Sequence, residues 1–313
     1  AFRLLMLAYA GVLLVSLGNQ FFDSNRDLAA ARARAGRSAE KQNAQFQEGI
    51  ARCEGAKAAG QLPVDVECGP PVGSEKLTAP PEAFYNDPRF DFRRETPPHV
   101  KVIGGTLALI GFLVGATFAG ADWSSGTVQS LLFWEPRRLR VMAAKIAALL
   151  TVIAGAAVTL LALLTGIEYL TAVVRGVVGD PTVGFYASLG LTGLRAVALA
   201  AFGSALGLGF AGLTRNTGAA LGVGFLYFAV AENAVRGLRP GWRRFLVGEN
   251  VNAWLDKAIV LADPHAQARG SEFVAVPREG FRLTMGRSGL TLGLYALTLL
   301  VVMTELFRRR DVT

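Results

Sequence analysis

Six apolar segments separated by polar ones run along the chain. Crossing the hydrocarbon core of a bilayer takes about 18–20 predominantly apolar residues. We therefore expect an all-α membrane protein with six transmembrane helices. Their ranges are residues 1–22, 101–121, 142–170, 186–213, 217–235 and 287–307. The first segment also has the basic start and apolar core of a signal peptide. No A-x-A cleavage site follows that core directly, because residues 19–22 are Asn, Gln, Phe and Phe, so we expect the segment to be retained.

Two polar segments are long enough to form loops or small domains, one after the first span and one after the fifth. Residues 23–100 contain an Ala-, Arg-, Gln- and Glu-rich stretch at 27–52, which favours a helix. A stiff linker is expected to follow it, marked by Pro70, Pro71, Pro80, Pro81, Pro97 and Pro98. Residues 236–286 form the second polar segment, which we expect to be a loop.

Basic residues give the topology. Three clusters fall on one face of a six-span arrangement: Arg137, Arg138, Arg140 and Lys145, then Arg215, then Arg308–Arg310. Cytoplasmic loops carry an excess of Lys and Arg, so this face, both termini and the tail at 308–313 are predicted to be cytoplasmic, and both long polar segments extracytoplasmic. The basic stretch that includes Arg236, Arg239, Arg243 and Arg244 contradicts this rule, because the same topology places it outside.

The two cysteines, Cys53 and Cys68, both fall in the first long polar segment. In an oxidising compartment such a pair favours a disulfide over two free thiols. The two histidines, His99 and His265, make no metal-ligand spacing with the cysteines, so no metal site is predicted. The net charge of +8, in a chain with only 18% charged residues, indicates contact with membrane lipid and not with nucleic acid.

No motif for catalysis is present. The chain has no G-x-x-x-x-G-K-[ST] loop for nucleotide phosphates, no G-x-S-x-G elbow and no H-E-x-x-H site, so we expect neither an enzyme nor a bound cofactor. Arg195 and Glu232 lie inside spans at similar depth, and we expect them to form an ion pair. That pair either fastens two neighbouring helices or lines a substrate path. The glycines of spans four and five are expected to let helices pack closely, within one subunit or between two.

The segment from Asp122 to Lys145 is amphipathic and basic. Ser124 and Ser125 suit a helix start, and Pro136 ends the helix before the next span. An interfacial helix held by lipid would have the same composition. Its pattern is an acidic residue, an aromatic, Gly-Thr, an aliphatic, Leu-Leu, Pro-Arg-Arg and a later Lys. The matching residues are Asp122, Trp123, Gly126, Thr127, Val128, Leu131, Leu132, Pro136, Arg137, Arg138 and Lys145.

This pattern resembles the cytoplasmic loop between the second and third spans of ABC transporter permeases of the type-2 exporter class. Asp122 stands where that family often has Glu. The resemblance implies that residues 122–141 form a coupling helix, which docks into a separate ABC ATPase subunit. It also implies a second permease copy, identical or related, with ATP and Mg bound by the partner subunit and none by this chain.

The function implied is the permease subunit of an ATP-driven exporter in the bacterial cytoplasmic (inner) membrane. The apolar, Gly- and Ala-rich spans favour a hydrophobic or amphipathic solute, such as a drug, an antibiotic or a lipid-like molecule. The alternative is a membrane protein that uses no ATP, either a secondary transporter or an anchor that presents residues 23–99 outside the cell. A secondary transporter is expected to show internal repeats, and the two halves of the chain have none that we recognise.

Overall fold

The computed structural model describes residues 2–23, 28–63, 66, 68–69, 79–127, 137–262 and 280–309. The chain forms two compact units, which we describe separately. Unit 1 comprises Ala1–Leu14, Arg93–Glu168 and Gly179–Thr313, and unit 2 comprises Val15–Phe92 and Tyr169–Val178.

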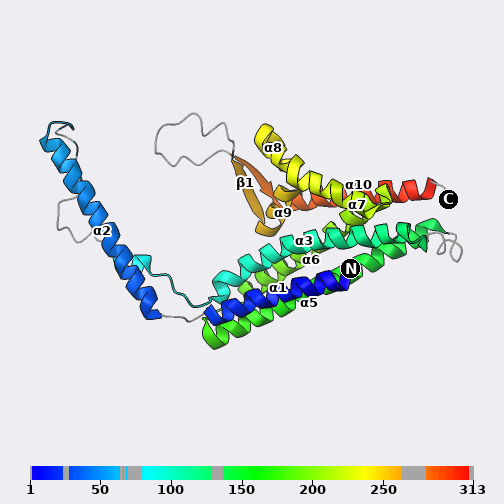
Figure 1. Cartoon of the computed structure of the whole chain (residues 1–313), viewed down its shortest axis with the longest axis horizontal. Helices are drawn as coiled ribbons and strands as arrows, with labels where there is room; N and C mark the ends of the chain where they lie inside the picture. Colours follow the sequence, from blue (N-terminus) through cyan, green and yellow to red (C-terminus); the bar gives the residue numbers. More distant parts are fainter. Residues whose placement is uncertain are drawn as a thin grey trace. The chain divides into compact units, whose positions relative to one another are not determined.

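The described part of the chain has five helices that are long and apolar enough to cross a membrane. They are Phe92–Trp123 within α3 (Phe92–Ser124), α5 (Arg138–Arg175), α6 (Val183–Thr214), the stretch Thr217–Leu238, and α10 (Met285–Arg309). Within α1 (Phe2–Asp23), the apolar stretch Leu7–Phe22 is shorter. A mostly helical protein with several membrane-length helices is therefore what the hydrophobic pattern led us to expect (Figure 1).

The stretch Thr217–Leu238 changes its helical geometry along its length. It begins as α7 (Thr217–Phe225), continues as the π-helical η3 (Leu226–Ala231) and ends as α8 (Glu232–Leu238). A π-helical turn inserts an extra residue per hydrogen-bonded ring and often marks a functional position.

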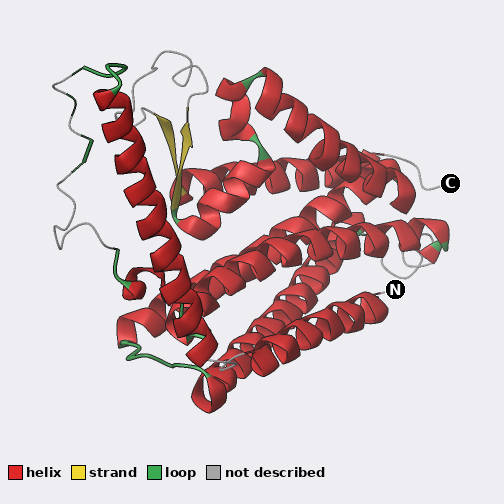
Figure 2. Cartoon of the chain, turned by 60° about the vertical axis from the view of Figure 1, so that its left-hand side comes forward, coloured by secondary structure: helices red, strands yellow, loops and turns green. Residues whose placement is uncertain are grey.

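The described residues of the predicted loop, 236–262 and 280–286, form regular elements. They contain η4 (Pro240–Phe245), α9 (Val247–Asp256) and an antiparallel hairpin of β1 (Ala258–Ala262) and β2 (Gly280–Thr284). This short hairpin is an addition to a fold that is otherwise helical, as predicted (Figure 2). Burial accounts for these elements: α9 packs on α6 and α10, where Leu199, Val247, Leu255 and Leu292 form one core cluster, and Leu283 of β2 is fully buried.

Glycines set the spacing between α3 and α6, which lie side by side in Figure 1. Cβ atoms added at Gly111 and Gly115 of α3 would lie 2.3 and 2.1 Å from backbone oxygens of α6. Cβ atoms added at Gly203 and Gly207 of α6 would lie 1.9 and 2.0 Å from backbone oxygens of α3. Each helix thus carries a G-x-x-x-G pair, the spacing that lets transmembrane helices approach closely. Gly203 and Gly207 of α6 therefore pack within the chain.

Unit 2 contains α2 (Leu28–Ala58), so the helix predicted over 27–52 is confirmed. Ala31, Ala35 and Ala39 are buried along one stripe of α2, and the Asn43 amide exchanges two hydrogen bonds with the backbone of Ala79. These contacts hold the chain around η2 (Pro81–Phe84) against the helix.

The predicted disulfide between Cys53 and Cys68 is present, with the two residues 15 positions apart. Closing a loop of this length contributes about 3 kcal/mol of stability in the chain-entropy description. One part of the predicted linker is wrong, because Pro97 and Pro98 lie inside α3.

Candidate functional site

The C-terminal end of α3 carries the first residues of the predicted coupling segment. Gly126 adopts a left-handed conformation with φ of 69°, which ends the helix at Ser124. Asp122 and Trp123 therefore belong to the last turn of α3, and the prediction of a separate helix beginning at residue 122 is wrong. The cause is that Ser125 and Gly126 act as a helix end: the Ser125 N–H donates to the carbonyl of Ala121 at 3.0 Å.

Asp122 forms an ion pair with Lys145 of α5, with 2.7 Å between Oδ2 and Nζ. The side chains are only 22% and 18% exposed, so water screens this pair less than it would a pair on the open surface. The two residues are 23 positions apart, and the pair ties the end of α3 to the beginning of α5. It therefore fixes both ends of the intervening segment that resembles a coupling helix.

Trp123 brings two further elements to the same place. The guanidinium carbon of Arg215, in the turn between α6 and α7, lies 4.6 Å from the centre of the indole ring, a cation–π contact. The ring of Phe307 in α10 meets the indole edge to face, with centroids 6.1 Å apart. Arg138 at the start of α5 donates a hydrogen bond to the carbonyl of Phe307 at 3.4 Å. Four membrane-length helices therefore meet around one tryptophan.

The space beneath this cluster is almost completely filled. A cavity of about 30 Å³ remains between Asp122, Trp123, Lys145 and apolar side chains of α3, α5, α6 and α10. Pockets for small molecules measure about 300–1,000 Å³, so this is not a substrate site. The cluster is therefore a packed junction of α3, α5, α6 and α10, at the point where the segment after Asp122 begins.

Basic residues gather at this end of unit 1. Arg137, Arg138, Arg140 and Arg308 line a surface recess of about 500 Å³. Together with Arg215 on Trp123, they bring the three basic clusters of the sequence to one end of the unit. The topology prediction assumed that these clusters share one face of the helices.

Several predicted site residues are thereby placed together: Asp122, Trp123, Gly126, Thr127, Arg137, Arg138 and Lys145 lie at this end. The Thr127 hydroxyl is 2.6 Å from that of Ser125. Val128, Leu131, Leu132 and Pro136 lie outside the described residues. Sequence reasoning missed the roles of Arg215 and Phe307, because neither belongs to the motif. The sequence feature that could have pointed to Arg215 is its position in the short turn between two predicted spans.

The predicted ion pair between Arg195 and Glu232 is not formed among the described residues. Glu232 pairs with Arg236 one turn along the same helix, at 3.0 Å, and accepts a hydrogen bond from the Gly248 N–H at 2.8 Å. The carbonyl of Arg195 accepts from the Trp254 indole at 3.1 Å. Gly248 and Trp254 are six residues apart on α9, about 9 Å along its axis. Glu232 and Arg195 therefore contact α9 near its opposite ends.

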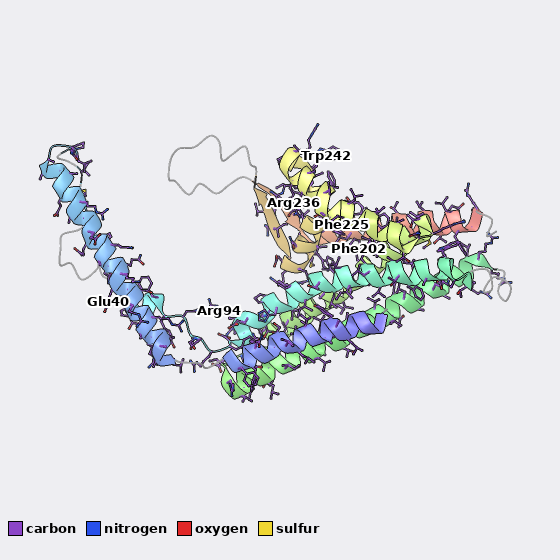
Figure 3. All side chains as sticks on the ribbon, viewed as in Figure 1. Glu40, Arg94, Phe202, Phe225, Arg236 and Trp242 are labelled. Carbon is purple, nitrogen blue, oxygen red and sulfur yellow. A yellow bond between two sulfur atoms is a disulfide. The ribbon has the colours of Figure 1, made fainter. Side chains whose placement is uncertain are left out.

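A four-charge network replaces the predicted pair. Glu249 accepts from Arg236 at 3.3 Å and from Arg243 at 2.9 Å, while Arg236 also binds Glu232 (Arg236 is labelled in Figure 3). Both carboxylates are nearly buried, with side chains 4% and 8% exposed. The network neutralises two of the arginines that contradicted the positive-inside rule, leaving Arg239 and Arg244 as the unexplained charges.

A third buried carboxylate, Glu168 of α5, lies beside the first turns of α3. Glu168 is fully buried and its Oε1 is 2.6 Å from Nδ1 of His99. The described residues contain no group of three His, Cys, Asp or Glu side chains able to hold a metal ion.

Comparison with protein-family models, with curated proteins and with solved structures finds no match to this chain.

Proposed function

We propose that the chain is the membrane-spanning permease subunit of an ATP-driven exporter, with six spans and both termini in the cytoplasm of a bacterium. It moves a hydrophobic or amphipathic solute across the cytoplasmic membrane. A separate ABC ATPase subunit binds ATP and Mg and supplies the energy, and a second permease copy, identical or related, completes the pathway.

The junction around Trp123 is the observation that carries this proposal. The segment after it resembles a coupling helix, and its two ends are joined by the ion pair between Asp122 and Lys145. A push on that segment reaches α3 and α5 directly and reaches the α6–α7 turn and α10 through Trp123. This is what a permease needs if a partner protein drives its helices. A lipid-held interfacial helix has no comparable need for a filled junction of four helices.

Co-purification tests the proposal. The full-length tagged chain, extracted from its native membranes in mild detergent, is expected to retain a protein that hydrolyses ATP. Leu131→Asp places a carboxylate on the apolar face that the motif assigns to the partner, and should reduce the retained ATPase by about tenfold or more. Leu238→Asp, the same substitution at a 79% exposed position at the end of α8, is the matched control and should leave retention unchanged.

The alternative functions give different outcomes. If no ATPase is retained by the wild-type chain, and solute export continues without ATP, the chain is a secondary transporter. If the chain neither retains an ATPase nor exports a solute, the disulfide-bonded unit 2 becomes the functional part, presented by a membrane anchor.

A further inference from the structure

A wide apolar groove opens in unit 1 on the side of α10 that faces α9. It has a volume of about 780 Å³, within the range of about 300–1,000 Å³ typical of ligand sites. Its lining comes from α3, α6, α7, η3, η4, α9 and α10 and is overwhelmingly apolar: Phe112, Leu206, Phe210, Gly224, Tyr227, Phe228, Phe245, Leu246, Val247, Leu294, Tyr295, Thr298, Leu299 and Val302. Leu294 and Val302 remain 51% and 44% exposed, so the groove is open at its side.

The groove has a basic end. One face of α10 contributes a stripe of groove residues: Leu294, Tyr295, Thr298 and Val302. Arg287 lies on the same helix, seven residues before Leu294. Residues seven apart lie on the same face of a helix, so Arg287 sits about two turns, or 10 Å, beyond the groove lining on the same side.

A second arginine reaches the same place from the opposite wall. Phe245 lines the groove, and its carbonyl accepts a hydrogen bond from the Tyr295 hydroxyl at 2.9 Å. The guanidinium carbon of the preceding residue, Arg244, lies 4.9 Å from the centre of the Phe245 ring and 5.6 Å from that of Phe281. The Arg287 guanidinium carbon lies 4.8 Å from the centre of the same Phe281 ring.

These two cations have no carboxylate partner among the described residues. They share one aromatic ring, which places their guanidinium carbons at most about 10 Å apart. Arginine does not lose its proton in proteins, so the repulsion between them cannot be relieved by deprotonation. An anion beside Phe281 would relieve it. The charges at Arg236 and Arg243 are already neutralised by Glu232 and Glu249.

We propose that the groove binds one anionic phospholipid, with its phosphate at Arg244 and Arg287 and an acyl chain along the α10 stripe. The occupant follows from charge and shape together: a long apolar groove open to its side accepts an acyl chain, and two arginines that pair with no carboxylate of the described residues favour a negative headgroup at one end. The site also accounts for the remaining basic charge of η4. It does not depend on the proposed transport function, because binding is measured on the chain without ATP or a partner.

Lipid titration of the purified full-length chain, followed by native mass spectrometry, tests the proposal. Phosphatidylglycerol and phosphatidylcholine with identical acyl chains are the probes. The wild-type chain is expected to bind one phosphatidylglycerol about tenfold more tightly than one phosphatidylcholine. Arg244→Gln with Arg287→Gln should abolish this preference while leaving phosphatidylcholine binding unchanged, which also shows that the variant is folded.

Two matched variants separate the headgroup from the acyl chain. Arg282→Gln removes an exposed charge from the neighbouring position of β2, whose side chain points to the other face of the hairpin, and should keep the preference. Thr298→Trp fills the groove and should weaken both lipids by about tenfold, whereas Leu297→Trp, off the stripe, should weaken neither. The proposal is overturned if the wild-type chain shows no preference, if Arg282→Gln removes it equally, or if Thr298→Trp leaves binding unchanged.

Discussion

Alanine at Gly203 and Gly207 provides a direct test of how closely α3 and α6 pack. The added Cβ atoms would lie 1.9 and 2.0 Å from the carbonyl oxygens of Ala108 and Phe112. Close carbon–oxygen contacts in proteins fall at about 3.3–3.6 Å, so the helices must separate by about 1 Å or more. Because the obstacle is backbone, no side-chain rotation removes the clash.

The magnitude follows from two opposing effects. Forcing one extra group into a well-packed interface costs about 1–3 kcal/mol, so two such groups cost about 2–6 kcal/mol. Replacing glycine by alanine inside a helix stabilises it by up to about 1 kcal/mol per site. We therefore expect a clear net loss for Gly203→Ala with Gly207→Ala, lowering the apparent Tm by several degrees. Gly111→Ala should lower the stability less in the double variant than in the wild-type chain, because the double variant already separates α3 from α6.

The same helix supplies the control. Gly190 and Gly193 have open space within 4 Å of an added Cβ atom, so alanine there should leave the apparent Tm unchanged or raise it. The assay is the fraction of full-length chain that remains monodisperse by size-exclusion chromatography after heating in detergent, at one fixed heating rate. If the Gly203 and Gly207 double variant is as stable as the Gly190 and Gly193 one, the packing described here is incorrect.

Three further predictions concern charge pairs and the disulfide. Asp122→Asn and Lys145→Gln should each cost about 1–3 kcal/mol, with the double variant costing less than their sum in a double-mutant cycle by apparent Tm; strict additivity would rule out the ion pair. Cys53→Ser should speed proteolytic cleavage of α2, as removal of about 3 kcal/mol of stabilisation implies, and reduction of the wild-type chain should have the same effect; equal cleavage rates in all three samples would contradict this. Glu232→Gln should destabilise the chain independently of Arg195→Gln, and a coupling energy above about 0.5 kcal/mol would restore the direct pair.

The hydrophobic pattern predicted the long helices well, because burial in lipid and helix formation both depend on uninterrupted apolar stretches. It placed their ends less well. The span expected at 142–170 lies inside a helix that runs from Arg138 to Arg175, since polar residues can continue a helix beyond the apolar part. Hydropathy therefore predicts the apolar part of a helix, not the full length over which its backbone is hydrogen-bonded.

Other features depended on contacts that the sequence does not specify. Counting residues along two helices gave Arg195 and Glu232 a similar depth, but not the direction of each side chain or the presence of α9 between them. The network around Glu249 joins residues of three short elements, which hydropathy reads as one polar loop. The junction at Trp123 was only half predicted: the motif supplied Asp122 and Lys145, and folding added Arg215 and Phe307.

The most direct test of the proposed function is photocrosslinking from the coupling segment in intact cells. A benzophenone amino acid at position 131 is expected to form a light-dependent adduct with an ATP-binding protein that carries a G-x-x-x-x-G-K-[ST] loop. The same probe at Trp242, a 63% exposed side chain in η4, should form no such adduct. An ATPase adduct from position 131 alone is the predicted result. Its absence from position 131, or an equal yield from Trp242, would contradict the proposal that this segment receives the movement of an ATPase.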